Sequence, residues 1–201
     1  GAQRTEMMEA IFGMRHIASG TVEVLGKKVD IKKPEDAIDN SIGMITEDRR
    51  GTGILGCLSI NDNTAIASYK NYTNAGVIDQ KKVDAVVKDS IQKLNIKTPS
   101  GKTLIQSLSG GNQQKVIFGK WLERSPNVFM MDDPTRGIDV GAKYEIYELI
   151  INMAKQGKTI IVVSSEMPEI LGITNRIGVM SNGHLAGIVN TKETNQEELL
   201  R

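Results

Sequence analysis

Residues 108–115 read LSGGNQQK, and residues 130–143 read MMDDPTRGIDVGAK. In the first stretch, Ser109, Gly110 and Gly111 precede a predicted helix, whose first backbone N–H groups are unpaired and whose dipole is positive at that end. Glycine lets a phosphate approach these donors closely, so the stretch is a candidate anion site. The alternative is that Gly-Gly serves only as a flexible lead-in to the helix.

The second stretch places a carboxylate after a buried strand. Asp132 follows four apolar residues, 128–131, which would hold it at the mouth of a sheet, where it can meet a magnesium ion, usually through water. Asp-Pro-Thr after a strand is also good turn chemistry, so a helix-capping or turn role for Asp132 is the alternative.

The chain around these motifs alternates between apolar strands and helical patterns. Three continuous apolar segments occupy residues 128–131, 159–163 and 176–180, and a helix-spaced apolar pattern separates the first two. This order predicts a parallel sheet covered on both faces. Ligands of such sheets bind beyond the carboxyl ends of the strands, and Asp132 and Asp133 lie at such an end.

The remaining segments have weaker signals. Residues 46–107 are mostly polar with helical spacing, so they predict a second lobe next to the sheet. The other predicted elements are a helix over 4–12, a hairpin over 21–31 around Gly26, a strand over 42–45, a helix over 112–124, and a connector and final helix over 190–201.

The composition indicates an ordinary globular chain. It has 201 residues, 39% hydrophobic and 24% charged, and no segment approaches the eighteen consecutive apolar residues of a membrane span. The net charge of +1 offers no electrostatic footprint for a polyanion, so we expect no nucleic-acid partner. A single cysteine, Cys57, excludes an internal disulfide framework and fits a reducing compartment, so we expect the cytoplasm.

In this order and at this spacing, the motifs resemble those of one family. LSGGNQQK, then Asp132 after its apolar run, then Gly137-Ile138-Asp139 resemble the signature, Walker B and D-loop of ATP-binding cassette (ABC) ATPases. The resemblance covers essentially the whole chain, and it implies a P-loop NTPase fold. That fold is α/β, with a mainly parallel sheet flanked by helices, a small antiparallel hairpin and a helical subdomain.

Further stretches are similar to one branch of this family. They are EDRR at 47–50, TRGIDVGAK at 135–143 and SSEMPEI at 164–170, which resemble the second cassette of bacterial sugar importers with two fused cassettes. GITNRIGVMSNG at 172–183 is most similar to the importers of galactose and methyl galactoside.

The resemblance also implies a domain organisation. Residues 1–201 would be a C-terminal nucleotide-binding domain, with 1–45 and 125–201 forming the RecA-like β core and 46–124 carrying the Q-loop, the helical subdomain and the signature helix. GAQRTEMMEAIFG at the amino terminus resembles the end of a phosphate loop running into a helix. We therefore expect a piece of a longer protein, with the preceding strand missing.

In ABC ATPases two cassettes sandwich ATP head to tail, with the signature of one facing the phosphate loop and Walker B of the other. The resemblance implies that Ser109, Gly110 and Gly111 contact the γ-phosphate of a nucleotide held mainly by a partner cassette. Gln113 and Asp139 are implied as further nucleotide contacts. In the chain's own pocket, Asp132 and Thr5 are implied as ligands of Mg²⁺.

The phosphate loop departs from the family pattern G-x-x-G-x-G-K-[ST]. It survives only as Gly1-Ala2-Gln3-Arg4-Thr5, with Gln3 at a glycine position and Arg4 at the lysine position. Glutamine restricts the backbone of the loop, and arginine is a larger planar fork, so both changes disfavour the cradling of a phosphate. Thr5 can still reach magnesium.

Three catalytic positions depart as well. Glu47 stands at the Q-loop glutamine and adds negative charge beside phosphate and metal. Asp133 stands at the catalytic glutamate and is one methylene shorter, which carries the carboxylate away from an attacking water. Ser165 stands at the switch histidine and lacks a charge to stabilise the transferring phosphoryl group. We predict a catalytically impaired site.

These points predict the nucleotide-binding domain of an ATP-driven sugar importer of the galactose and methyl-galactoside type, at the cytoplasmic face of the membrane. It would be a degenerate cassette that supplies its signature to a partner, with very weak ATPase activity as an isolated fragment. The implied cofactors are ATP and Mg²⁺. The implied partners are an N-terminal cassette of the same polypeptide, membrane permease subunits and, indirectly, a periplasmic or extracellular sugar-binding protein.

Two alternatives remain open at this point. In one, Arg4 and Asp133 suffice, and the chain is a self-sufficient ATPase that hydrolyses ATP at its own site. In the other, the chain is a non-transport ABC ATPase of translation or DNA repair. The near-neutral charge and the lack of a long basic or coiled-coil insertion argue against the second.

Overall fold

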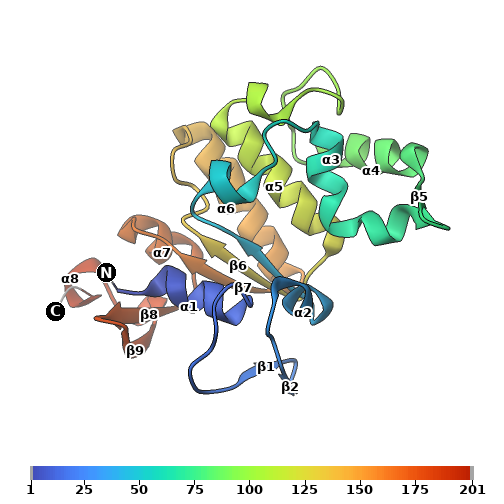
Figure 1. The fold of residues 1–201 in the computed structure, drawn as a ribbon. Helices are drawn as coiled ribbons and strands as arrows, with labels where there is room; N and C mark the ends of the chain where they lie inside the picture. The colour runs from blue at the N-terminus through green and yellow to red at the C-terminus, as the bar shows by residue number, and fades with distance from the viewer. Residues whose placement is uncertain (1, 200–201) are drawn as a thin grey trace. The chain divides into compact units, whose positions relative to one another are not determined.

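Contacts between residues divide the chain into two units. The structure is a computed structural model and describes residues 2–199 (Figure 1). Unit 1 comprises the chain up to residue 44, residues 127–134 and residues from 147 onward. Unit 2 comprises residues 45–126 and 135–146.

Unit 1 contains the strands and the helices that flank them. Its elements in chain order are α1 (Arg4–Ile11), β1 (Val22–Val24), β2 (Lys27–Val29), α2 (Pro34–Asp39), β3 (Ile42–Ile45), β6 (Val128–Asp132), the later part of α6 (Val140–Lys155), β7 (Thr159–Val163), α7 (Met167–Ile173), β8 (Arg176–Ser181), β9 (His184–Asn190), the short 3₁₀ helix η4 (Thr191–Glu193) and α8 (Gln196–Leu199).

A three-stranded sheet forms the core of unit 1, with the strand order β3-β6-β7. β6 lies in the middle and pairs in parallel with β7, from Val128 opposite Thr159 to Asp132 opposite Val163. Its residues Phe129, Met130 and Met131 are almost completely buried, as expected for a strand covered on both faces. The parallel sheet predicted from the apolar runs is confirmed for these two strands, and β6 ends in Asp132 as predicted.

The predicted hairpin near the amino terminus is confirmed. β1 and β2 pair antiparallel across Leu25 and Gly26, whose φ angles of 51° and 74° are those of a tight two-residue turn.

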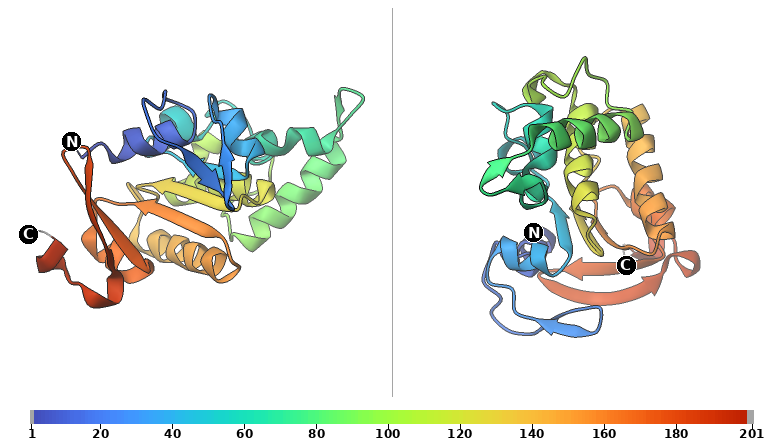
Figure 2. Two further views of the ribbon diagram at one scale, coloured as in Figure 1. Left: turned by 90° about the horizontal axis from the view of Figure 1, so that it is seen from below. Right: turned by 90° about the vertical axis from the view of Figure 1, so that its right-hand side faces the viewer.

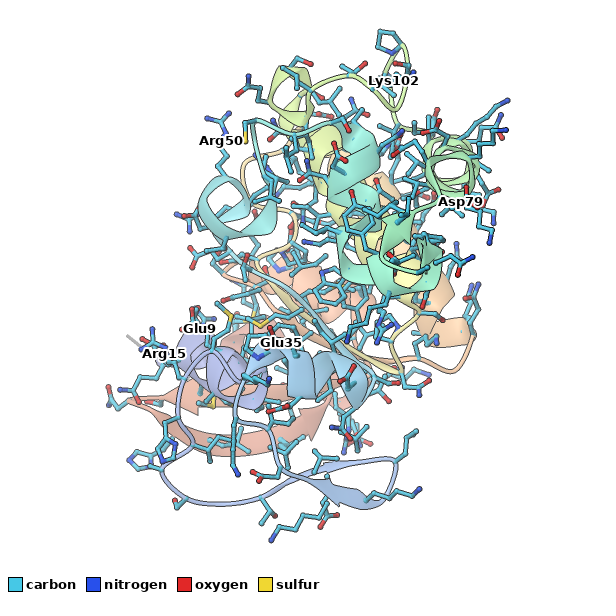
Figure 3. The ribbon with its side chains drawn as sticks, turned by 45° about the vertical axis from the view of Figure 1, so that its right-hand side comes forward. Glu9, Arg15, Glu35, Arg50, Asp79 and Lys102 are labelled. Carbon is cyan, nitrogen blue, oxygen red and sulfur yellow. The ribbon has the colours of Figure 1, made fainter. Side chains whose placement is uncertain are left out.

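Glu9 of α1 forms an ion pair with Arg15 just after the helix, and Figure 3 shows the two side chains together.

One predicted strand pairing is wrong. The apolar run 176–180 was expected to extend the parallel sheet, but β8 pairs antiparallel with β9 in a separate two-stranded sheet (Figure 2). The reason is the turn Asn182-Gly183, whose φ angles of 47° and 80° fit the two-residue hairpin connection that Asn-Gly favours. The Asn-Gly dipeptide in the sequence could have predicted this hairpin, but the prediction relied on the apolar run of β8.

Unit 2 is mainly helical. Its elements in chain order are the π-helical turn η1 (Arg49–Gly53), α3 (Ile60–Ala65), the 3₁₀ helix η2 (Ile66–Tyr72), β4 (Thr73–Asn74), β5 (Val77–Ile78), α4 (Gln80–Lys93), the 3₁₀ turn η3 (Ile105–Ser107), α5 (Gly110–Arg124) and the first part of α6. The helical spacing predicted within residues 46–107 is confirmed by α4, in which Val83 and Val87 are buried.

α5 is the central helix of unit 2 and packs against α3, η2 and α4 (Figure 1). Val116, Ile117, Phe118 and Trp121 bury an apolar face that runs over adjoining turns, which explains why the helix forms here. The helix was predicted from Asn112, but it begins at Gly110, so the two glycines lie inside its first turn.

Among residues 2–199, no helix is both long and apolar enough to cross a membrane.

Gly13 offers a test of the loop after α1. Its φ is +83°, and a Cβ there would lie 2.6 to 2.9 Å from backbone atoms of Lys33. Gly13→Ala should therefore lower the free energy of unfolding by about 3 kcal/mol, from backbone strain plus overpacking against the Lys33 backbone. Chemical denaturation of the purified chain measures this loss.

Gly26→Ala is the matched control. Gly26 also has a positive φ, +74°, but no atom lies within 4 Å of the position of its Cβ. This variant should lose only about 1 kcal/mol from backbone strain. Equal losses in the two variants would contradict the assigned contact between Gly13 and Lys33.

Candidate functional site

The predicted signature residues lie together at the start of α5 in unit 2. Ser109 is the N-cap residue with extended backbone, and its Oγ accepts a hydrogen bond from Asn112 Nδ2 at 2.9 Å. The backbone at Gly111 is so close to α6 that a Cβ would lie 2.6 Å from the Cβ of Ala142. A Cβ on Gly110 would lie 3.1 Å from the carbonyl oxygen of Gly137. Packing therefore requires glycine at Gly111 and leaves little room for a side chain at Gly110.

A pocket of about 220 Å³ opens beside this turn and is lined by Ser109, Gly111, Asn112, Asp139 and five neighbouring residues of unit 2. Asp139 faces it from the start of α6, where its Oδ1 accepts a hydrogen bond from the backbone N–H of Ala142 at 2.9 Å. Asp139 thus caps α6. The structure brings together four of the predicted nucleotide contacts, Ser109, Gly110, Gly111 and Asp139.

Gln113 is placed differently from the other predicted contacts. Its side chain is only 3% exposed, and its Nε2 donates to the carbonyl oxygens of Ile105 (3.3 Å) and Leu108 (3.2 Å). Its Oε1 accepts from Arg49 Nε at 3.3 Å. Gln113 therefore braces the turn before α5 from inside, and its contact with a nucleotide stays a prediction.

The loop that carries Glu47 leads into a π-helical turn. The N–H of Gly53 bonds the carbonyl oxygen of Asp48 and that of Ile54 bonds Arg49, which are i to i−5 bonds that often mark functional sites. The carboxylate of Glu47 forms an ion pair with Arg136, within unit 2. In this structure, therefore, the residue at the Q-loop position is engaged by an arginine.

Two lysines of unit 2, one buried and one partly buried, have polar partners that no sequence pattern predicts. Lys115 is 4% exposed, pairs with Glu145 and donates to the carbonyl oxygen of Asn95 at 3.0 Å. Lys120 donates to the carbonyl oxygen of Gly53 at 3.0 Å, and burial lowers its pKa to about 8. No sequence signal marks these roles, since a lysine on a polar helix reads as solvent-exposed.

A second group of predicted site residues lies in unit 1, at the end of β6. Asp132 is 1% exposed, and its Oδ2 is buried without a hydrogen-bond partner. Burial raises the pKa of Asp132 and the charge of Asp133 raises it further, whereas a hydrogen bond with Thr5 and the charge of Arg4 lower it. An orphaned carboxylate oxygen next to a hydroxyl fits a hard cation such as Mg²⁺. Asp132 and Thr5 are the two residues that the resemblance implies as ligands of Mg²⁺, and that role stays a prediction.

Asp133 and Ser165 lie in contact. Asp133 adopts the left-handed region with a φ of 42°, and its Oδ1 accepts hydrogen bonds from the backbone N–H of Ser165 (2.8 Å) and from Ser165 Oγ (3.3 Å). These are the two residues predicted at the catalytic glutamate and switch histidine positions. Through this contact, Oδ1 of Asp133 is held by hydrogen bonds from Ser165.

The residues predicted to belong to a phosphate loop lead into α1. Gln3 has a φ of 59°, so it adopts the left-handed conformation that suits glycine, at a strain of about 1 kcal/mol. Arg4 Nη1 donates to the carbonyl oxygen of Ser164 at 3.2 Å. Ala2 is half-buried, and Gly1 lies outside the described residues.

The fold and these two groups of residues define an ATP-binding cassette of the P-loop ABC type. The sequence profile of the ABC transporter family matches residues 1–136, and the chain belongs to this family. Its whole length is 57% identical to the galactose/methyl galactoside import ATP-binding protein MglA of Treponema denticola and 51% identical to that of Salmonella typhimurium. The chain spans about 40% of the length of each of these relatives.

Solved structures agree on the fold. A dimeric ATP-binding cassette in a post-hydrolysis state, bound to ADP and Pi, matches 94% of this chain and 81% of its own, with a TM-score of 0.78 at 17% identity. The cbiO1 protein of Clostridium perfringens, part of an ABC transporter complex, matches 99% of this chain and 77% of its own, with a TM-score of 0.77 at 20% identity. At these identities the likeness concerns the fold alone.

Lys120 gives this site a pH dependence. Because its pKa falls from 10.5 to about 8 in the folded chain, the unfolded chain binds more protons between these two pH values. The free energy of unfolding should therefore rise with pH in this window, by about 2 to 3 kcal/mol in total, and Lys120→Met should lack the rise. Urea denaturation at pH 7.5 and pH 10 measures it.

Lys88→Met is the control, since Lys88 is an exposed lysine of α4. The stability difference between this variant and the unsubstituted chain should be the same at both pH values. If Lys120→Met gives a constant difference as well, Lys120 is not buried as described.

Proposed function

We propose that this chain is the nucleotide-binding domain of an ATP-driven sugar importer of the galactose and methyl-galactoside type. Identity of 51–57% along the whole chain to relatives of that name supports the proposal. The importer would comprise an N-terminal cassette of the same polypeptide, membrane permease subunits and, indirectly, a sugar-binding protein outside the cell. The permease would hold the chain at the cytoplasmic face of the membrane.

Within this importer, we propose that the chain acts mainly through its signature. The observation that carries this proposal is the contact of Asp133 with Ser165. A carboxylate that is one methylene shorter than glutamate and already accepts two hydrogen bonds is poorly placed to take a proton from water. Ser165 itself adds no positive charge for a phosphoryl group in transfer.

The signature, by contrast, has the features of a phosphate contact. The first N–H groups of α5 have no partner within the helix, and the positive end of the helix dipole lies there. Ser109 is exposed at this helix start, and Gly110 beside it is partly exposed. These donors would bind the γ-phosphate of an ATP that the partner cassette holds, and they would stabilise charge that develops during transfer.

The chain's own pocket would still bind a nucleotide weakly. Thr5 and Asp132 would hold magnesium, whose charge would neutralise the phosphate oxygens when the ion is bound. Arg4 keeps a positive charge at the lysine position. However, Arg4 already donates to the carbonyl oxygen of Ser164, and Gln3 holds a strained backbone, so the phosphate loop is a poorer cradle than the family pattern provides.

A second candidate function is a self-sufficient ATPase that uses this pocket. The orphaned Oδ2 of Asp132, adjacent to Thr5, favours it, because these residues keep the arrangement of a metal site. The two candidates differ in which cluster controls turnover. In the first candidate it is the turn at Ser109, and in the second it is the carboxylate of Asp133.

Ser109→Glu in the full-length protein, purified with its permease subunits, should reduce kcat for ATP hydrolysis about 100-fold, because a carboxylate replaces a donor beside the phosphate. Ser109 is preferred to Gly111, where any side chain would collide with Ala142. Asp133→Asn should change kcat less than about twofold, because the proposed reaction occurs in the partner's pocket. A coupled phosphate-release assay measures both.

Gln106→Glu is the control for added charge, since Gln106 is exposed three residues before Ser109. It should leave kcat within about twofold of the unsubstituted protein. If Asp133→Asn abolishes turnover while Ser109→Glu spares it, the self-sufficient ATPase is correct. Co-purification with ribosomes instead of permease subunits would point to a non-transport ABC protein.

A further inference from the structure

We infer that Arg49 is a positioning residue that locks the signature turn and the loop 136–139 into one arrangement. The inference rests on the proposed function for its effect on turnover, whereas the locking itself is a property of unit 2 alone. All of the groups involved lie within residues 47–53, 110–120 and 136–142, which belong to this unit.

The guanidinium of Arg49 bridges two segments that are far apart in the sequence. Its Nε donates to Gln113 Oε1 at 3.3 Å, and its Nη1 donates to the carbonyl oxygen of Arg136 at 3.3 Å. Gln113 is the brace of the turn before α5, and Arg136 precedes Gly137 and Asp139. One planar side chain thus spans the interval between the signature helix and the loop that follows β6.

The third nitrogen of Arg49 lies against the signature itself. Nη2 is 3.0 Å from the position that a Cβ on Gly110 would occupy, so Arg49 fills the space beside this glycine. Both acceptors of Arg49 are neutral, and among the described residues no carboxylate pairs with it. Its charge therefore remains uncompensated next to the positive end of α5, where a phosphate would bind.

A second contact fixes the turn from which Arg49 projects. At the other end of η1, the carbonyl oxygen of Gly53 accepts a hydrogen bond from Lys120. Lys120 lies seven residues after Gln113, two helical turns along α5, so η1 is attached to α5 at both of its ends. A π-helical turn is uncommon, and these two contacts hold it in a single orientation.

Arg50 shows that the effect is specific to one of two adjacent arginines. Its side chain is exposed and points outward from the loop (Figure 3), and no hydrogen bond links it to α5 in the described part of the chain. Arg49 and Arg50 carry the same charge, so charge alone does not distinguish them. Only Arg49 has the fork of donors aimed at Gln113 and Arg136.

The test compares Arg49→Gln with Arg50→Gln in the full-length protein purified with its permease subunits. Hydrogen exchange without nucleotide, followed by mass spectrometry, reports the locking directly. Peptides that cover residues 113–117 and 140–146 should exchange at least about fivefold faster in Arg49→Gln, because both helix starts lose their shared brace. The Arg50→Gln protein should exchange like the unsubstituted one.

Steady-state ATP hydrolysis reports the consequence for turnover. Arg49→Gln should lower kcat about tenfold and change KM less than about twofold, because the signature acts in the closed state whereas the partner's loop holds the nucleotide. A merely structural role would lower the melting temperature without this split. Arg49→Lys keeps the charge but not the fork, and it should show the same changes in exchange and kcat if Arg49→Gln does not fold.

Each outcome has a distinct meaning. Unchanged exchange in a folded Arg49 variant overturns the inference, whatever the ATPase rate. Faster exchange with reduced kcat supports both the inference and the proposed function. Faster exchange with normal kcat supports the locking by Arg49 and overturns the proposed function of the signature, since a displaced signature would then have no effect on hydrolysis.

Discussion

The close approach of α5 to the start of α6 is the constraint on which unit 2 depends. At Gly111 the two backbones lie so near each other that even a methyl group would collide with Ala142. This packing sets Asp139 beside the first turn of α5, whose N–H groups have no partner within the helix. The fold therefore requires a glycine at Gly111, whatever ligand this turn binds, so a substitution there would first disturb the packing of α5 on α6.

The two groups of site residues differ in how their polar atoms are satisfied. At the end of β6, Asp133 accepts a hydrogen bond from Ser165, whereas Oδ2 of Asp132 is buried with no hydrogen-bond partner. At the start of α5, Asn112 donates to Ser109 and Arg49 donates to Gln113, and the first backbone N–H groups have no partner within the helix. The buried oxygen of Asp132 fits a cation, and the start of α5 has the dipole and N–H groups that suit an anion, so the two groups differ in the ligand that they favour.

Sequence patterns predicted the elements that local physics decides. Three patterns each fit one kind of element, and the structure confirms them. They are the apolar run of β6, the amphipathic spacing of α4 and the turn at Gly26. For β8 the sequence held two conflicting signals. Its apolar run favoured a place in the parallel sheet, whereas Asn182-Gly183 favoured a hairpin, and the structure has the hairpin. The contacts of Arg49, Lys115 and Lys120 join residues 20 to 87 positions apart, so no local pattern could reveal them.

β9 has a further consequence for work with this chain. All seven of its residues are exposed, Leu185, Ile188 and Val189 among them, and β8 is its only partner strand in the described structure. The outer side of β9 thus presents open N–H and C=O groups beside apolar side chains, which is a template for strand addition by another molecule. We therefore expect charged residues in place of the exposed Leu185, Ile188 and Val189 to oppose such strand addition.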